Sequence, residues 1–343
     1  MTTNNAAYLP SPSAKPLEIR PTEHRYPDET ELVIRTAAVA INQIDWKIQD
    51  SPWTDFPYPL ILGEDVAGTV VDVGSCVTRF EKGDRVIGHA VGVFSGDERH
   101  GGFQEYVVLE ENMAAAIPGT MGFEKGVVLP LGVSTASAAL FQGEGQGGLG
   151  LARPSIDSVK RADGETVLVW GGTTSVGSNA IQLAVAAGYE VIATASEKNF
   201  GYVRKLGAGV VVDYKSKGAV QDVVAAFQGK KLAGAFDTVG SADSSKATVA
   251  VVQQVEGNKV VASVDELEDL PLGVTGVDVQ AVAIRENDVS EMIYGDYLPK
   301  ALAAGKYLTA PEPYIAGVGL KAIQGTFEAQ KKASARKVVV TIF

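Results

Sequence analysis

Short, continuous apolar runs alternate with helical segments through the middle of this 343-residue chain. Strands that are apolar on both faces are typical of a parallel sheet covered by helices on either side. The alternation therefore predicts an α/β domain over residues 125–286, in which the Gly-rich stretch 143–150 is expected to be a flexible surface insertion. The strands are expected at residues 167–170, 191–194, 210–213, 235–237, 259–263 and 279–284.

The chain on either side of this domain has a different pattern. Residues 1–124 have β-strand composition with Gly and Pro between the runs, and the pattern after residue 286 is mixed. We therefore expect a second, β-rich domain formed by residues 1–124 and 287–343. Its clearest elements are expected to be strands at 31–35 and 66–73, a helix over 289–304 and a terminal strand over 338–342.

One strand-turn-helix passage, from Val167 to Ala184, has the layout of a dinucleotide-binding turn. In such turns the helix N-terminus faces the pyrophosphate of the cofactor. Gly172 and Gly177 hold the first and third positions of the G-x-G-x-x-G fingerprint, but Thr174 holds the middle one, so the match is degenerate. A glycine turn that only packs a helix on a sheet remains the alternative. The candidate phosphate-binding residues are Gly172, Thr173, Thr174, Ser175 and Val176.

The end of the next apolar run indicates which nicotinamide cofactor is bound. An acidic residue there would hold the ribose 2′-hydroxyl of NAD, but Thr194 and Ala195 are not acidic. The following residues offer donors and one positive charge, which suit the 2′-phosphate of NADPH. The alternative is that Lys198 is only a solvated loop residue. The expected 2′-phosphate pocket consists of Ser196, Lys198, Asn199 and Tyr214.

Composition narrows the function classes. The net charge of −11 argues against nucleic acid and anionic membrane surfaces as partners. The single cysteine, Cys76, excludes an internal disulfide and any zinc site built from several cysteines. We expect no signal peptide, because the N-terminus lacks a basic stretch followed by an apolar one. We expect no transmembrane helix, because no apolar stretch approaches about 18 residues. A cytoplasmic protein is the simplest interpretation.

Three further landmarks occur in order along the chain. The segment Gly63–Gly74, continued by Gly83-Asp84-Arg85-Val86, resembles the GroES-like domain signature of medium-chain dehydrogenase/reductases. Residues 102–107 and 129–136 match the next two landmarks of that family. The resemblance covers essentially the whole chain and is closest to fungal zinc-independent enoyl reductases and quinone oxidoreductases. It implies an α/β fold in which a Rossmann doubly wound parallel sheet is joined to a β-rich GroES-like domain.

The chain departs from the zinc-dependent branch of this family at the ligand positions. Zinc alcohol dehydrogenases have a cysteine ligand where this chain has Asn42 and a histidine ligand where it has Glu64. Residues 92–101, which correspond to the structural zinc lobe, contain no cysteine. Because a catalytic zinc needs three protein ligands plus water, we expect no metal, and the pattern argues against alcohol oxidation. The histidines, His24, His89 and His100, are not at metal-ligand spacing.

The resemblance also assigns roles to individual residues. Asn42 is the expected catalytic residue, whose amide would donate a hydrogen bond to the substrate oxygen, unless it is only a turn asparagine. Trp53 stands where some relatives carry a proton-donating tyrosine, so solvent is the expected proton source. Trp53, Phe94 and Phe141 are expected to line an apolar substrate pocket, with an ordinary core role equally open. Further cofactor-binding candidates are Asp45, Trp46, Lys47, Thr135, Val261, Ser263 and Arg336. The alternatives are a solvated lysine for Lys47, a helix cap for Thr135 and a basic turn for Arg336.

The sequence thus predicts an NADPH-dependent reductase that transfers hydride, without a metal, to an activated double bond of an enone or enoyl group or to a quinone. The alternative is a protein that binds NADPH without turnover, as a redox sensor or structural protein. A free small-molecule substrate is expected, because the acidic chain offers no positive patch for an acidic carrier protein. A homodimer is conceivable through the apolar segment 279–284.

Overall fold

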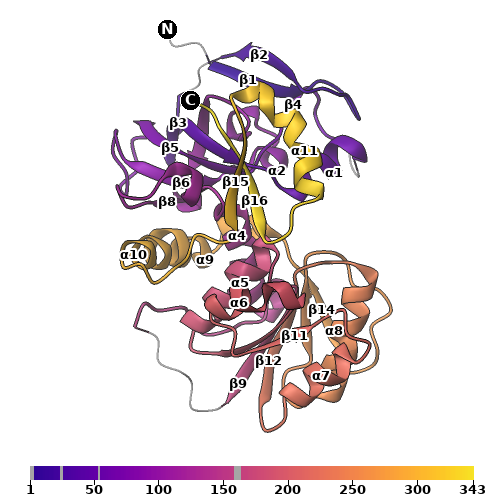
Figure 1. Cartoon of the computed structure of the whole chain (residues 1–343). Helices are drawn as coiled ribbons and strands as arrows, with labels where there is room; N and C mark the ends of the chain where they lie inside the picture. Colours follow the sequence, from indigo (N-terminus) through magenta and orange to yellow (C-terminus); the bar gives the residue numbers. More distant parts are fainter. Residues whose placement is uncertain (1–3, 24–25, 53–54, 158–163) are drawn as a thin grey trace. The chain divides into compact units, whose positions relative to one another are not determined.

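The computed structural model describes residues 4–23, 26–52, 55–157 and 164–343. The chain divides into two compact units (Figure 1). Unit 1 contains the residues up to Leu131 together with Tyr294–Gly305 and Thr309–Phe343, and unit 2 contains Gly132–Ile293 and Lys306–Leu308. Both ends of the chain therefore belong to unit 1, and the middle of the chain forms unit 2.

Unit 1 is β-rich. Its larger sheet has the strand order β15-β16-β3-β5-β6-β8, with β7 also paired to β3, and a smaller sheet has the order β2-β1-β4. The strands are β1 (Asn4–Leu9), β2 (Glu18–Thr22), β3 (Glu31–Ala40), β4 (Leu60–Ile61), β5 (Asp65–Val73), β6 (Arg85–His89), β7 (Tyr106–Glu110), β8 (Ala114–Ala116), β15 (Glu312–Val318) and β16 (Arg336–Thr341). The helices are α1 (Gln43–Asp50), α2 (Gly92–Ser95), α3 (Phe123–Gly126), α10 (Leu298–Ala303) and α11 (Ile323–Lys331), with short 3₁₀ turns η1 (Glu98–His100), η2 (Glu111–Met113) and η7 (Leu320–Ala322).

The core of unit 1 joins the two ends of the chain. Strand β3 is buried along most of its length and pairs with β5, β7 and β16. The rings of Phe103 and Phe327 lie 6.4 Å apart in the same apolar cluster, although the two residues are far apart in the sequence. Burial of such side chains contributes about 1.5–3 kcal/mol each. The polar residues at the ends of β3, β5 and β16 are therefore held on a rigid base.

Unit 2 contains one parallel sheet with the strand order β11-β10-β9-β12-β13-β14. From β9 the sheet continues through β10 and β11 on one side and through β12, β13 and β14 on the other, which is the order of a Rossmann doubly wound sheet. The predicted fold class is therefore confirmed. The strands are β9 (Glu165–Trp170), β10 (Glu190–Ala195), β11 (Val210–Asp213), β12 (Lys231–Asp237), β13 (Val260–Ser263) and β14 (Thr275–Asp278).

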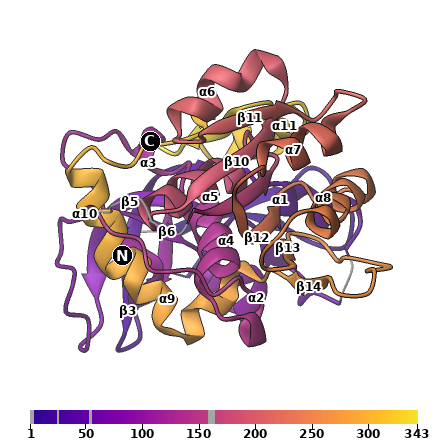
Figure 2. The same cartoon turned by 90° about the horizontal axis from the view of Figure 1, so that it is seen from below.

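Helices connect the strands from β9 to β13. Helices α7 and α8 lie side by side (Figure 2), and their apolar residues Val223, Val251 and Val252 share a core cluster with Leu168 of β9 and Ile192 of β10. The helices are α4 (Pro130–Phe141), which begins just before the unit boundary, α5 (Ser175–Ala186), α6 (Phe200–Lys205), α7 (Ala219–Ala226), α8 (Ala242–Gln254) and α9 (Asp288–Ser290), with 3₁₀ turns η3 (Glu144–Gln146), η4 (Glu197–Asn199) and η5 (Ala281–Glu286). No helix in the described ranges is long and apolar enough to cross a membrane.

Two sequence predictions in this part of the chain are wrong. Residues 279–284 do not form a strand: the edge strand is β14, just before them, and Ala281–Glu286 is a 3₁₀ turn. An edge strand is bonded to a neighbour on one side only and tolerates polar, exposed residues, so hydrophobicity pointed to the wrong segment. Residues 143–150 are not a loose insertion, because Leu149 is buried and its backbone N–H donates to Ala139 of α4 at 2.8 Å.

The helix predicted over 289–304 is present as one continuous helical segment. It consists of α9, a π-helical stretch η6 (Glu291–Tyr297) and α10. Pro299, in the first turn of α10, has no backbone N–H to donate, which favours a change of helical hydrogen bonding just before it.

Candidate active site and cofactor-binding site

The predicted catalytic residue, Asn42, lies immediately before α1 and is 6% exposed. Its backbone N–H donates to the Asp45 carboxylate at 2.7 Å, which fixes the start of the helix. Its side-chain Nδ2 donates to Asp65 Oδ2 at 2.8 Å, and its Oδ1 accepts from Lys337 Nζ at 2.5 Å. The amide is therefore engaged by residues distant in the sequence. We call Asn42, Asp65 and Lys337 the polar triad.

The polar triad is closed by a buried ion pair. Lys337 Nζ lies 2.7 Å from Asp65 Oδ2, and the two side chains are 5% and 0% exposed. The other carboxylate oxygen of Asp65 accepts the backbone N–H of Leu131 at 2.6 Å. Asp65 begins β5 and Lys337 is the second residue of β16, so two strands of one sheet hold the charges. Neither residue was assigned a role from the sequence.

Further carboxylates lie beside the polar triad. Asp45 accepts backbone hydrogen bonds from Asn42 and, at 3.0 Å, from Gly63. Burial raises the pKa of Asp45 well above its ordinary value, and the nearby charges of Glu64 and Asp65 act in the same direction. Glu64 is fully buried, 3.5 Å from His89 Nε2. Asp45 was a cofactor-binding candidate, but both of its carboxylate oxygens are committed to backbone groups of unit 1.

The predicted nucleotide-binding turn joins β9 to α5 in unit 2. Gly171 has φ +95°, a conformation that favours glycine, and its N–H donates to the Thr194 hydroxyl at 3.0 Å. Gly172 N–H donates to the Thr194 carbonyl at 2.8 Å. Thr174 caps α5, because its hydroxyl accepts the N–H of Gly177 at 2.8 Å. The glycine with the left-handed backbone is thus the residue before the predicted first glycine of the fingerprint.

A glycine is needed at position 177 because helix α5 approaches the turn after β9 closely there. A Cβ atom on Gly177 would lie 2.3 Å from the carbonyl oxygen of Gly171 and 3.0 Å from Thr238 Oγ1. Thr238, just after β12, lies 2.9 and 3.0 Å from the carbonyl oxygens of Trp170 and Gly171 and within reach of the Thr174 hydroxyl. Thr238 therefore connects β12 to the turn. Nothing in the sequence pattern indicated this role.

The start of α5 is suited to an anion. Thr173, Thr174, Ser175 and Val176 are all partly exposed, whereas the helix is buried from Gly177 to Ala184. The first backbone N–H groups of a helix have no partner within it, and the helix dipole favours negative charge there. The turn lies at the carboxyl end of β9, next to the point where the strand order reverses, which is where ligands bind in such sheets.

The predicted 2′-phosphate pocket lies at the carboxyl ends of β10 and β11. Ala195 pairs with Asp213 in register, so the residues that follow them, Ser196 and Tyr214, leave adjacent strands at the same edge. Asn199 Nδ2 donates to Ser196 Oγ at 3.2 Å, while Lys198 and Tyr214 are exposed. Lys215, whose Nζ lies 5.8 Å from the centre of the Tyr214 ring, adds a positive charge that we did not predict.

The remaining candidates lie in both units. In unit 1, Trp46 Nε1 donates to Gln330 at 2.5 Å, whereas Lys47 and Arg336 are exposed. In unit 2, Thr135 is buried in α4, and Val261 and Ser263 are fully buried in β13. Of the predicted substrate-pocket residues, Phe94 is 44% exposed, Phe141 is buried at the end of α4, and Trp53 lies outside the described residues.

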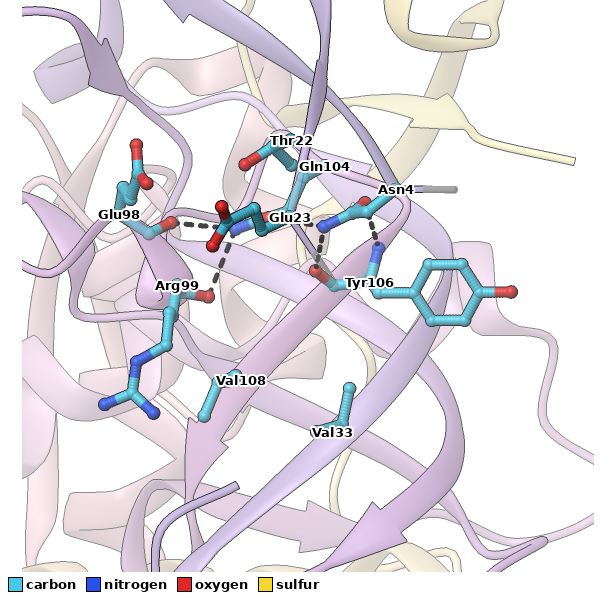
Figure 3. Close-up of a pocket in the computed structure, with 9 residues that line it drawn as sticks. All are labelled: Asn4, Thr22, Glu23, Val33, Glu98, Arg99, Gln104, Tyr106 and Val108. Carbon is cyan, nitrogen blue, oxygen red and sulfur yellow. Dashed lines mark hydrogen bonds between the residues drawn. The ribbon is translucent and has the colours of Figure 1, made fainter. Parts of the chain in front are cut away.

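A small polar cavity of unit 1 is distinct from this site (Figure 3). Figure 3 shows Gln104 in its centre, donating to the carbonyl oxygens of Glu98 and Arg99 and accepting from Asn4. Its volume of about 10 Å³ holds roughly one water molecule, so neither a nicotinamide nor a substrate fits. It is also lined by none of the predicted site residues.

Comparisons with known proteins agree with the fold of both units. Residues 28–119 match the alcohol dehydrogenase GroES-like domain, and residues 175–303 match the zinc-binding dehydrogenase domain. The chain is 42% identical to the dehydrogenase pigH of Monascus ruber, with all of both chains covered, and 37% identical to the trans-enoyl reductase himH of Aspergillus japonicus, with 99% of this chain and 97% of the relative covered. The structure is similar to that of Escherichia coli quinone oxidoreductase complexed with NADPH, with a TM-score of 0.71 at 20% identity and 99% and 100% of the chains covered.

The residues at the family's catalytic zinc position do not fit zinc. Asn42 presents an amide, and its oxygen is already bonded to the ammonium of Lys337. That ammonium group also occupies the space beside Asp65 Oδ2, so a metal cation would meet a positive charge that lies 2.7 Å from the carboxylate of the triad. Among the described residues, no group of three or more His, Cys, Asp and Glu side chains is arranged to hold a metal ion.

The two domain matches, the full-length similarity to pigH and himH and the fold lead to the same conclusion. The chain belongs to the medium-chain dehydrogenase/reductase family.

Proposed function

We propose that this protein is an oxidoreductase that uses NADPH to reduce an activated carbon–carbon double bond of an enone or enoyl group, or a quinone, without a metal. The relatives named dehydrogenase and trans-enoyl reductase support a reductase role. The observation that carries the proposal is the polar triad: an amide and an ammonium are fixed where a zinc-dependent relative would need metal ligands.

The chemistry needs a hydrogen-bond donor rather than a Lewis acid. When bound, a nicotinamide cofactor would supply a hydride, with both electrons, to the β-carbon of a conjugated double bond. The π electrons move toward the carbonyl, and negative charge develops on its oxygen, where a preorganised donor stabilises it. Asn42 Nδ2 has two hydrogens, and Asp65 accepts only one of them. The other is available to the substrate oxygen, and water then protonates the α-carbon.

The choice of NADPH rests on the residues at the ends of β10 and β11. Ser196, Asn199 and Tyr214 offer hydrogen-bonding groups, and Lys198 and Lys215 offer positive charge. Strand β10 ends at Ala195 rather than at an acidic residue, at the position that selects NAD. The similar structure of quinone oxidoreductase was complexed with NADPH, which supports the same cofactor.

The test of this function is an Asn42→Ala variant assayed with enones, enoyl thioesters and quinones. Loss of one donor to a developing oxyanion typically lowers kcat by about 10²–10³-fold, and NADPH affinity should remain near that of the wild type. Asn4→Ala is the matched control, because Asn4 is also a buried asparagine of unit 1 with its amide bonded to a side chain, but it lies at the small cavity. An Asn42→Ala variant that folds and turns over like Asn4→Ala would remove Asn42 from the mechanism. A wild type that binds NADPH but reduces none of these substrates would favour a non-catalytic NADPH-binding protein.

A further inference from the structure

Lys337 is a charged residue in an unexpected place. It is buried at the start of β16, in a strand whose next residues, Val338, Val339 and Val340, are apolar and buried, while its neighbour Arg336 is exposed. An ammonium group has three N–H donors. Two of them are directed at Asn42 Oδ1 and Asp65 Oδ2, at 2.5 and 2.7 Å. The buried charge is thus bonded directly to the side chain proposed to meet the substrate and to the carboxylate beside it.

The contacts of the polar triad determine which way the Asn42 amide faces. In the observed orientation, its oxygen faces the ammonium and its NH₂ faces the carboxylate. Rotation of the amide by half a turn would direct NH₂ at the ammonium and oxygen at the carboxylate, so that both contacts would become repulsive. With its oxygen bonded to Lys337, the amide presents its remaining N–H, rather than its carbonyl, to any further partner.

The charge of Lys337 has a second consequence. Without it, the buried carboxylate of Asp65 would lie next to Asn42 as an uncompensated negative charge, and a substrate that develops negative charge at the same amide would be repelled. The ion pair makes the triad neutral overall. A buried ion pair is a weak source of net stability, because desolvation offsets the attraction between its charges. Orientation and neutrality are therefore a better account of Lys337 than stability.

We infer that Lys337 is a positioning residue: its ammonium, held by Asp65, takes the place of a metal cation in this site and fixes the Asn42 amide as a hydrogen-bond donor to the substrate oxygen. The inference rests on the proposed function. It adds a residue that acts on the substrate only through Asn42, and it makes the three side chains one unit in catalysis.

The first experiment is a double-mutant cycle on kcat. Lys337→Met retains the unbranched side chain as far as Cε without the ammonium group and should lower kcat by about 10²-fold, as expected when a reacting group is misplaced. In an Asn42→Ala background, the same substitution should change kcat by less than about twofold, because residues that act as a unit are not additive. Lys82→Met is the control: Lys82 forms an exposed ion pair with Asp72 in unit 1 and should leave kcat unchanged. Equal effects of Lys337→Met in the two backgrounds would overturn the inference.

A second variant distinguishes a loss of activity from a loss of folding. Lys337→Met leaves Asp65 unpaired, so Lys337→Met combined with Asp65→Asn is made in parallel, which leaves neither charge alone. This neutral pair should restore the melting temperature toward that of the wild type but not kcat, because the Asn42 oxygen still lacks its cationic donor. Recovery of kcat together with stability would show that Lys337 has only a structural role.

The third measurement does not depend on turnover. Protein labelled with ¹⁵N-asparagine gives a side-chain amide signal for Asn42, identified by its absence in Asn42→Ala. Its two protons should exchange slowly with solvent in the wild type and at least about tenfold faster in Lys337→Met, because the ordered amide is released. Unchanged exchange would overturn the positioning role. Faster exchange in a protein that reduces no substrate would refute the proposed function while retaining Lys337 as the residue that orients Asn42.

Discussion

Substitution of Gly177 by alanine is the sharpest test of the nucleotide-binding turn. Gly177 is the third residue of α5, where alanine is ordinarily preferred to glycine by about 1 kcal/mol. Helix propensity alone would therefore predict a stabilised protein. The added Cβ, however, would lie 2.3 Å from the Gly171 carbonyl oxygen, well inside van der Waals contact.

The steric clash of the added Cβ should cost more free energy of unfolding than the helix propensity of alanine contributes. The Gly171 carbonyl cannot move freely, because it accepts the Thr174 N–H at 3.1 Å and lies 3.0 Å from the Thr238 hydroxyl. Overpacking of a close contact typically costs about 1–3 kcal/mol, and a rigid backbone neighbour places this one at the upper end. After the helix gain of about 1 kcal/mol is subtracted, we expect a net loss of about 2 kcal/mol in the free energy of unfolding. The shift of the turn should also weaken NADPH binding.

The assay is urea unfolding of the variant together with titration of NADPH by fluorescence. Two other helical glycines serve as controls, because substituting them by alanine changes helix propensity without creating a steric clash. Gly325 has the same third position in α11, Gly201 lies in the first turn of α6 in unit 2, and a Cβ on either meets nothing within 4 Å. Gly325→Ala and Gly201→Ala should be neutral or stabilising by up to about 1 kcal/mol. If Gly177→Ala were as stable as these controls and bound NADPH equally well, the close approach of α5 to the turn would be refuted.

The other predictions concern the cofactor, acid stability and metal. NADPH should bind about ten- to a hundredfold more tightly than NADH, and Lys198→Ala should remove most of this gap without changing the Kd of NADH; equal Kd values in the wild type would refute the pocket. Burial opposes ionisation of Glu31, but hydrogen bonds with His100 and the Asp28 N–H and the charge of Arg99 lower its pKa below the ordinary value of 4.5. The ionised carboxylate therefore stabilises the folded protein, and the free energy of unfolding should fall as the pH drops below 4.5 through the lowered pKa. Glu31→Gln should flatten that part of the Tm-against-pH curve, and an unchanged slope would assign the acid loss to other groups. Elemental analysis should find no stoichiometric zinc, and chelators should leave turnover unchanged; one zinc per chain would contradict our interpretation of the polar triad.

The central strands of unit 2 could be predicted from the sequence because a strand that is buried on both faces is marked by its own run of apolar residues. The strand predicted at 191–194 begins with the apolar residues Val191, Ile192 and Ala193, and it lies within β10, a central strand that is buried from Val191 to Ala195. The edge strand β14 was missed for the opposite reason. Its residues are Thr-Gly-Val-Asp, and backbone pairing with β13 rather than burial makes them a strand. Hydrophobicity carries no signal for such pairing.

The candidate site could be predicted only in part, for a related reason. The turn at Gly172 was predicted from its own strand-turn-helix pattern, and Asn42 was predicted because relatives share a motif there. Asp65 and Lys337 are far apart in the sequence and come together only because β5 and β16 both pair with β3. A lysine in front of a buried apolar strand was the one available signal, since a charged residue is rarely buried unless it is paired.

The most direct test of the account is transfer of deuteride from NADPH to a conjugated substrate. The wild type is incubated with NADPH deuterated at C4, on each face in parallel, and with an enone or enoyl thioester; the product is then examined by mass spectrometry and NMR. We predict one deuterium at the β-carbon from one of the two cofactors, none at the α-carbon, and a rate that falls about 10²–10³-fold in Asn42→Ala. Tight NADPH binding without deuterium in any product, and without oxidation of NADPH by quinones, would contradict the assignment of this protein as a metal-independent reductase.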